Sequence, residues 1–239
     1  MKPAGYFVTG TDTGVGKTLV ACALLRALAA VGHRTVGMKP VAAGATLTAE
    51  GLLNDDVAQL RAASTVDADL ALVNSYCFEP AIAPHIAARQ AGVEIDLAQI
   101  SAAYTKLAAQ ADVVIVEGAG GLCVPLNAAE DTLDLAAQLN LPLILVVGMR
   151  LGCLNHAILS ARVIAARGLA FAGWVANRID AEMPVARENI ATLAERLGAP
   201  LLAEFPFDAA PGPLKMARQF SFSGTRALPA SRAVTAGKI

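Results

Sequence analysis

The sequence predicts an α/β fold with a doubly wound, mostly parallel sheet. Short β-rich runs alternate along the chain with alanine-rich amphipathic segments, a pattern typical of strands joined by crossover helices. The run at residues 113–116 is wholly apolar, as expected for a strand that is covered on both faces. The high hydrophobic content, 55% of residues, fits the same architecture. We expect strands at residues 6–9, 35–38, 113–117, 143–147 and 173–176.

The chain is expected to form one domain followed by a short tail. No linker rich in Pro, Gly or Ser and no charge run divides the first 210 of its 239 residues. After Phe205 the composition changes to several prolines and then to a Ser/Ala/Arg-rich stretch. We therefore predict an α/β catalytic domain over residues 1–217 and a poorly ordered C-terminal tail over residues 218–239.

Composition argues against several classes of protein. The net charge of −1 provides no basic surface for nucleic acid, so we expect no nucleic-acid partner. The longest apolar stretch, residues 141–149, is too short to span a membrane, and the N-terminus lacks the pattern of a signal peptide. We therefore expect a cytoplasmic protein with no membrane partner. The widely spaced cysteines Cys22, Cys77, Cys123 and Cys153 disfavour zinc and disulfide frameworks, and Cys22 should be a buried helix residue.

The first strand is followed by a glycine-rich loop of the kind that binds phosphate. Residues 10–18 read GTDTGVGKT and precede a helical pattern at residues 19–31. Backbone N–H groups of such a loop, the helix N-terminus, a lysine and a hydroxyl together bind phosphates and Mg²⁺. The usual spacing is G-x4-G-K-[ST], but here Thr11 stands where the first glycine should be. We predict a P-loop NTPase-like domain with nucleotide contacts at Gly14, Val15, Gly16, Lys17, Thr18 and Leu19.

Polar residues at the ends of two further strands complete the predicted site. Lys39 directly follows the second strand, where it can neutralise phosphoryl oxygens or be a solvated surface lysine. Glu117 ends the third strand and precedes a turn of small residues that lets backbone N–H groups approach an anion. Asp56 opens a helical pattern and is either part of its cap or a second metal ligand. Because Mg²⁺ needs only one or two carboxylates, the candidate set is Thr18, Asp56 and Glu117.

These motifs resemble those of dethiobiotin synthetases, the ATP-dependent enzymes that close the ureido ring of the biotin precursor. The resemblance runs from residue 5 to about residue 208 and rests on residues 6–13, 39–41, 54–56, 84–85, 116–121, 151–156 and 173–177. The lengthened phosphate loop is a property of that family. The resemblance implies a homodimer that uses 7,8-diaminopelargonate, CO₂ and ATP, with Mg²⁺ as the metal.

The resemblance also implies roles for individual residues. Lys39, Lys17 and Thr11 would be catalytic, with Thr11, Gly120 and Gly121 beside the carbamate. Ala43 stands where the family commonly has a serine or threonine that contacts the diamine. The substrate carboxylate would be bound by the partner subunit, at the helix start that contains Gly152, Cys153 and Asn155. The remaining nucleotide contacts would be Asp56, Glu117, Gly118, Ala119 and Gly120, with Asn177, Arg178, Pro206, Phe207 and Asp208 around the base.

Two other kinds of protein deserve comparison. Nucleotide-switch ATPases of the positioning or partitioning type use a similar loop, but they carry a lysine just before the glycines that reaches across their dimer. This chain has Asp12 at the matching position. A non-catalytic nucleotide-binding scaffold would tolerate loss of Lys39 or Glu117, and both are present. We therefore favour the dethiobiotin synthetase interpretation.

Overall fold

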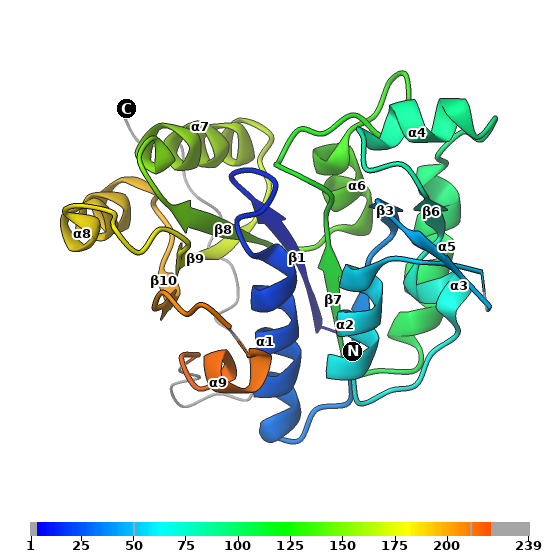
Figure 1. Cartoon of the computed structure of the whole chain (residues 1–239), viewed down its shortest axis with the longest axis horizontal. Coiled ribbons are helices and arrows are strands. Elements are labelled where there is room, and N and C mark those ends of the chain that lie inside the picture. Colours follow the sequence, from blue (N-terminus) through cyan, green and yellow to red (C-terminus); the bar gives the residue numbers. More distant parts are fainter. Residues whose placement is uncertain (1–3, 50, 211, 221–239) are drawn as a thin grey trace.

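The protein is built around a six-stranded parallel sheet in the order β10-β9-β8-β1-β7-β2 (Figure 1). The computed structural model describes residues 4–49, 51–210 and 212–220. All five predicted strands are confirmed, most of them slightly longer than expected, and β10 was not predicted. The bounds are β1 Ala4–Gly10, β2 Thr35–Met38, β7 Val113–Glu117, β8 Leu143–Met149, β9 Phe171–Arg178 and β10 Leu201–Phe205.

Helices connect the strands and cover both faces of the sheet. The first begins two residues before the predicted start, because Gly16 in the left-handed conformation ends the loop directly ahead of Lys17. The helices are α1 Lys17–Ala30, α2 Asp55–Ala63, α3 Leu70–Val73, α4 Pro84–Gln90, α5 Leu97–Ala108, α6 Thr132–Leu139, α7 Cys153–Ala166, α8 Ala186–Arg196 and α9 Pro213–Ala217.

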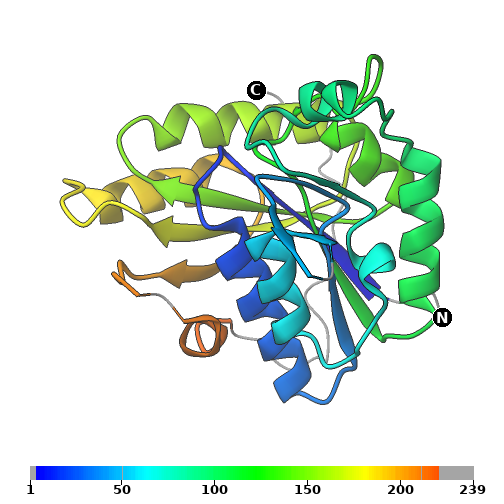
Figure 2. The same ribbon diagram turned by 45° about the vertical axis from the view of Figure 1, so that its right-hand side comes forward.

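Alternation of side chains along the strands divides the core into two layers. On β1, Tyr6 and Val8 pack with α1 and α9, whereas Phe7 between them faces the cluster that contains residues of α5, α6, α7 and α8. Figure 2 shows the same arrangement, with the blue α1 and orange α9 on one side of the sheet and α7 and α8 on the other. Cys22 of α1 is fully buried, as predicted.

Two small strand pairs lie outside the central sheet, and neither was predicted. Strand β3 (Val41–Ala43) pairs in parallel with β6 (Tyr76–Phe78), and β4 (Thr46–Thr48) pairs antiparallel with β5 (Gly51–Leu53). Helix α2 follows β5, and the side chain of Asn54 caps it by accepting a hydrogen bond from the Asp56 backbone N–H at 3.0 Å. The cap is therefore Asn54, which leaves the Asp56 carboxylate available to the site.

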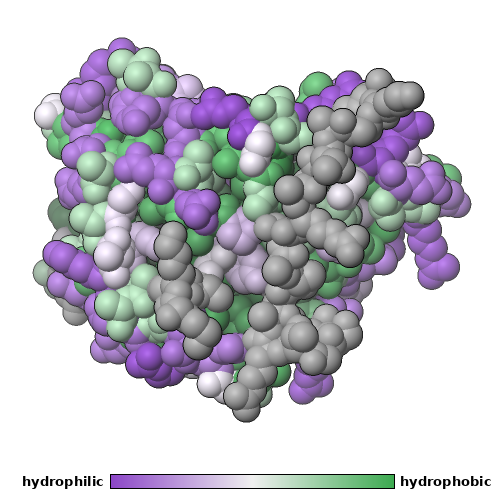
Figure 3. Space-filling view, turned by 180° about the vertical axis from the view of Figure 1, so that it is seen from behind, coloured by the Kyte–Doolittle hydropathy of each residue, from purple (hydrophilic) through white to green (hydrophobic). Residues whose placement is uncertain are grey.

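The described chain ends on the α1 side of the sheet. Phe220 is 7% exposed, and its ring meets that of Phe205 edge-on with centroids 5.8 Å apart. Most of the predicted tail, residues 221–239, lies outside the described residues. The coloured residues of the rear face in Figure 3 are a mixture of hydrophilic and hydrophobic ones. None of the helices in the described part of the chain has the length and apolar character that a membrane crossing needs.

Candidate active site

A cleft of about 820 Å³ opens where the carboxyl ends of β1, β2 and β7 meet. In a parallel sheet all strands end at the same edge, so the loops that follow them converge there. Most of the predicted phosphate, metal and carbamate residues line this cleft. The lining consists of Asp12, Thr13, Gly14, Gly16, Lys17, Thr18, Lys39, Val41, Ala43, Asp56, Ala81, Ile82, Ala83, Pro84, Glu117, Ala119, Gly120, Gly121 and Val124.

The phosphate loop forms one wall of the cleft. Gly14 and Gly16 have φ angles of 73° and 91°, which favour glycine. The Lys17 ammonium donates to the Asp12 carbonyl at 3.0 Å, inside the loop. Burial, and then the nearby charge of Lys39, lower the pKa of Lys17 to about 8. The Lys17 ammonium thus lies where anionic phosphates would bind, and a phosphate there would favour its charged form.

Lys39 lies at the centre of a buried charged cluster. Its ammonium donates to Glu117 Oε1 at 2.6 Å and to Asp56 Oδ2 at 2.8 Å. The side chains of Lys39 and Glu117 are 6% and 0% exposed, and that of Asp56 is 37% exposed. Burial alone lowers the pKa of Lys39, but the two carboxylates outweigh it and raise that pKa. Burial also tends to raise the pKa of Asp56. The charge of Lys39 and its hydrogen bond act in the opposite direction, and the pKa of Asp56 is lowered overall. The surface-lysine interpretation of Lys39 is therefore wrong.

The cluster contains oxygen atoms of the kind that could hold Mg²⁺. The Thr18 hydroxyl donates to Glu117 Oε1 at 2.9 Å, so the three predicted ligands lie together. Glu117 Oε2 is buried and has no hydrogen-bond partner among the described residues. Carboxylate and hydroxyl oxygens are ligands that Mg²⁺ prefers, and a buried carboxylate oxygen without a partner is suited to a cation. No group of three or more His, Cys, Asp or Glu in the described chain is arranged as a metal site.

The small-residue turn after β7 packs closely against the phosphate loop. A Cβ on Gly118 would lie 2.9 Å from the ring of Phe7, so β1 and this turn can touch only because residue 118 has no side chain. Gly120 has a φ of 61°, and a Cβ there would lie 3.5 Å from the Thr13 hydroxyl. Ala119, Gly120 and Gly121 line the cleft, as the sequence predicted.

Thr11 was predicted to lie beside the carbamate, and that role stays a prediction. Its backbone N–H donates to the Val146 carbonyl at 3.0 Å, and its hydroxyl donates to the same oxygen at 3.5 Å. Thr11 is therefore directed toward β8 and is absent from the cleft lining, whereas Thr13 is present there. The sequence analysis did not include Thr13 among the site residues, although its position directly before Gly14 of the phosphate loop could have indicated it. It also missed the wall formed by Ala81–Pro84.

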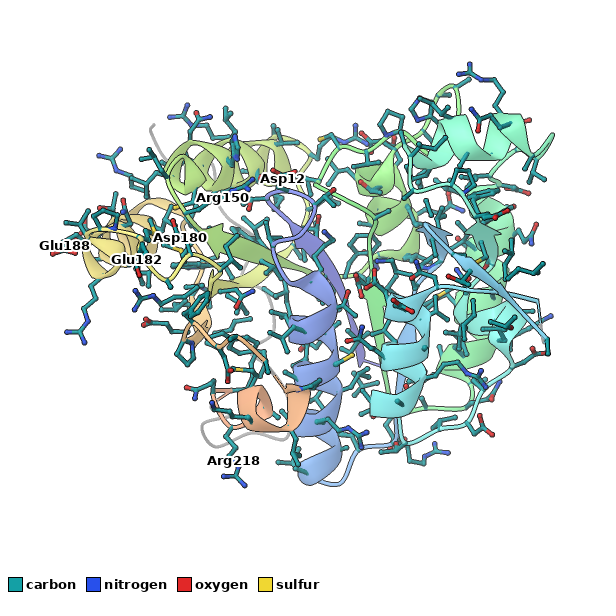
Figure 4. All side chains as sticks on the ribbon, viewed as in Figure 1. Asp12, Arg150, Asp180, Glu182, Glu188 and Arg218 are labelled. Carbon is teal, nitrogen blue, oxygen red and sulfur yellow. The ribbon has the colours of Figure 1, made fainter. Side chains whose placement is uncertain are left out.

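An ion pair joins the phosphate loop to the segment after β8. Arg150 Nη2 lies 2.5 Å from Asp12 Oδ2, and both side chains are about half exposed. Asp12 Oδ1 also accepts the Thr13 backbone N–H at 2.7 Å. Figure 4 shows Asp12 and Arg150 side by side at the top of the loop. Asp12 is therefore engaged with a cation of its own chain.

The residues predicted to surround the base lie beyond the cleft lining. Asn177 is the second-last residue of β9, is buried, and donates from its side-chain amide to the Val15 carbonyl at 2.8 Å. Its neighbour Arg178 has a buried Nε with no partner among the described residues. Phe207 is 46% exposed, and Asp208 forms an ion pair with Lys215 at 2.7 Å. Pro206 is also exposed. Base binding by this region stays a prediction.

The predicted carboxylate-binding segment starts α7 and also lies outside this cleft. Gly152 precedes the helix with a φ of 94°, and no side chain caps the helix N-terminus. Cys153 is 3% exposed, Asn155 is exposed, and Leu151 is 96% exposed. Free backbone N–H groups at a helix N-terminus attract anions. Gly152, Cys153 and Asn155 are not among the residues that line the cleft of their own chain, and binding of a partner's substrate by this segment stays a prediction.

Comparison with known proteins decides the family. A family model described as an AAA domain matches residues 4–213. ATP-dependent dethiobiotin synthetase BioD of Aromatoleum aromaticum is 55% identical over 223 residues, which cover 93% of this chain and 99% of that protein. The chain belongs to the dethiobiotin synthetase family. The counterpart from Nitrosospira multiformis is 56% identical over 204 residues, covering 85% of this chain and 88% of that protein. The predicted family is thereby confirmed, and with it the prediction of an ATP-dependent ligase.

Two solved structures of other proteins share the fold of this dethiobiotin synthetase family member. The septum site-determining protein MinD complexed with Mg-ADP, from Pyrococcus horikoshii, has a TM-score of 0.53 at 21% identity and covers 95% of this chain and 91% of that one. A ParA family ATPase from Chlorobium tepidum has a TM-score of 0.53 at 15% identity, covering 94% and 97%. Identities this low establish the P-loop NTPase fold alone. They give no support to the interpretation of this chain as a nucleotide-switch ATPase.

Proposed function

We propose that the cleft catalyses the ATP-dependent carboxylation and ring closure of 7,8-diaminopelargonate with CO₂ to give dethiobiotin, ADP and phosphate. One amine captures CO₂ as a carbamate, and the γ-phosphoryl group of ATP is transferred to a carbamate oxygen. The second amine then attacks the carbonyl carbon of the carbamic-phosphoric anhydride and expels phosphate. The observation that carries this proposal is Lys39, buried between Glu117 and Asp56 on the cleft that also contains Lys17.

The two lysines supply positive charge at different points of the reaction. Lys17, in the phosphate loop, would contact the phosphoryl oxygens of ATP. Lys39, across the cleft, would neutralise the carbamate and the phosphoryl group transferred to it. Because both groups are largely removed from water, their charges act more strongly than they would in solution. Ala43 lines the same cleft but presents only a methyl group, so one hydrogen bond to the diamine is absent.

Thr18, Asp56 and Glu117 would hold Mg²⁺ in the same cleft. When bound, the ion would offset the negative charge of the phosphate oxygens and orient them. The proposal is supported by the buried Glu117 oxygen that has no partner among the described residues. Asn177, Arg178 and residues 206–208 would surround the base of ATP. A cytoplasmic location and the absence of nucleic-acid and membrane partners stay predictions.

We further propose that the enzyme is a homodimer in which each diamine site uses both subunits. The exposed start of α7, with Gly152, Cys153 and Asn155, would bind the substrate carboxylate of the partner's site. The uncapped helix N-terminus and the almost fully exposed Leu151 support this assignment, because both features are suited to contact with another surface.

Subunit complementation tests the shared site. Lys39→Ala should abolish turnover while largely preserving ATP binding, and Asn155→Asp should impair diamine binding by adding a charge near the carboxylate. When the two inactive variants are mixed and allowed to exchange subunits, half of the dimers are mixed and each contains one intact site. About a quarter of wild-type activity should therefore return.

Recovery of no activity, with subunit exchange verified by mass spectrometry, would contradict the shared site. Unchanged turnover in Lys39→Ala would contradict the catalytic assignment.

A further inference from the structure

The end of β9 is bonded to the phosphate loop through one side chain. Asn177 is 5% exposed, and its Nδ2 donates to the Val15 carbonyl at 2.8 Å across 162 positions of sequence. Only the amide NH₂ can donate to a carbonyl oxygen, so this contact fixes which way the side-chain amide points. Asn177 therefore helps to hold the phosphate loop in place, in addition to any contact that it makes with the base of a nucleotide.

The surrounding residues are shaped to accommodate this contact. A Cβ on Gly16 would lie 2.2 Å from Asn177 Nδ2, which real contacts do not allow. Val15 is 1% exposed, and it fits because Gly148 and Gly10 have no side chains. A Cβ on Gly148 or Gly10 would lie 2.8 or 2.7 Å from the Val15 methyl groups. The corner of the loop at Val15 and Gly16 is therefore closely packed against β8 and β9.

Geometry connects this corner to phosphate binding. The peptide bond between Val15 and Gly16 is planar and trans, so its carbonyl and its N–H point in opposite directions. Holding the Val15 oxygen on Asn177 consequently turns the Gly16 N–H away from β9. Gly16 lines the cleft, and α1 begins at the next residue with N–H groups that have no partner within the helix. The start of the loop has a separate anchor, from the Thr11 N–H to the Val146 carbonyl.

We propose that Asn177 is a positioning residue for phosphate binding, which orients the Val15–Gly16 peptide so that the N–H groups at the start of α1 face the phosphates. This inference rests on the proposed function in that the cleft binds ATP. It extends that function, because a residue that only read the base would have no influence on a ligand without a base. Inorganic triphosphate is such a ligand.

The test compares triphosphate binding and loop protection in two variants. Asn177→Ala removes the amide, and Asn177→Leu removes the donor while keeping the volume of the side chain. Asn127→Ala is the matched control, because the Asn127 amide also donates to a backbone carbonyl, that of Ile95 at 3.0 Å, and Asn127 is not among the residues that line the cleft. Calorimetry with inorganic triphosphate and Mg²⁺ measures affinity. Hydrogen exchange of the ligand-free protein measures the protection of residues 14–19, and thermal unfolding verifies that each variant is folded.

Both Asn177 variants should bind triphosphate about threefold to tenfold more weakly than the wild type, as expected for the loss of one buried hydrogen bond. Amides of residues 14–19 should exchange faster in both, whereas Asn127→Ala should match the wild type in both measurements. Weaker ATP binding with unchanged triphosphate affinity and unchanged exchange would overturn the inference, because Asn177 would then serve the base alone. If the wild type bound neither ATP nor triphosphate, the proposed function would fail. Hydrogen exchange of residues 14–19 would then be the measurement that decides whether Asn177 anchors the phosphate loop.

Discussion

Replacing Lys39 with methionine should destabilise the protein strongly, because it removes the cation that two carboxylates share. Methionine keeps the length of the side chain but not its charge. Glu117, with a side chain that is 0% exposed, would remain buried with only the Thr18 hydroxyl at 2.9 Å as a donor. Its second oxygen already lacks a partner among the described residues. A buried charge in this situation has lost most of the interactions that offset its removal from water.

The expected magnitude follows from the burial of each pair. Removing one partner of a buried ion pair costs about 3–5 kcal/mol, and this applies to Lys39 and Glu117. The Asp56 side chain is 37% exposed, so its pair with Lys39 adds less than about 1 kcal/mol. Because the pKa of Lys39 is raised in the folded state, its contribution is complete below the ordinary lysine value of 10.5 and is lost only at higher pH. The full effect should therefore be present at neutral pH.

Urea unfolding in Mg²⁺-free buffer at neutral pH measures this loss. Arg150→Met is the matched control, since it removes a cation whose distance to a carboxylate is similar but whose side chain is 45% exposed. That control should cost less than about 1 kcal/mol. The penalty of Lys39→Met should shrink when Glu117 is also replaced by leucine, because no buried charge then remains. If Lys39→Met cost no more than Arg150→Met, the account of the buried cluster would be wrong.

Three further predictions concern backbone strain, proton linkage and the metal. Val185 has a φ of 48°, which is unfavourable for a β-branched residue, so Val185→Asn should stabilise the protein by about 1 kcal/mol, and Asn140→Val, at a φ of 52°, should destabilise it similarly. Chemical denaturation measures both, and an unchanged Val185→Asn stability would argue against the strain. Because the pKa of Lys17 is lowered to about 8 in the free protein, ATP affinity should fall as the pH rises above that value, with proton uptake on binding. Calorimetry in buffers of different ionisation enthalpy tests this, and equal affinities on both sides of that pH would refute it. Glu117→Gln should raise the Mg²⁺ concentration needed for half-maximal turnover at least about tenfold, and an unchanged requirement would remove Glu117 from the metal site.

The sequence predicted the central strands well because strands covered on both faces are apolar along their whole length. Strand β10, Leu201–Phe205, was missed since it lies at the edge of the sheet and includes the exposed Glu204. The pairs β3–β6 and β4–β5 have only three residues in each strand, too few to produce a recognisable periodicity. The strands β3 and β6 pack against α4, a tertiary contact that the local sequence does not reveal.

The candidate site could be predicted from the sequence where its residues lie at the carboxyl ends of strands. Lys39 directly follows β2 and Glu117 ends the parallel β7, so their proximity could be inferred from topology alone. The orientation of individual loop side chains could not. Thr11 and Thr13 are two residues apart in one loop, and only the bond from Thr11 to Val146 shows which of them faces β8. The contact between Asn177 and Val15 joins residues far apart in sequence and depends on the direction of one amide.

The measurement that tests the central claim most directly is phosphate release from MgATP and bicarbonate, with and without 7,8-diaminopelargonate, while dethiobiotin is followed by mass spectrometry. Phosphate release that depends on the diamine and equals the dethiobiotin formed is the predicted result. ATP hydrolysis that is indifferent to the diamine and yields no dethiobiotin would contradict the proposed reaction. The roles assigned to Lys39 and Asn155 would then be withdrawn first.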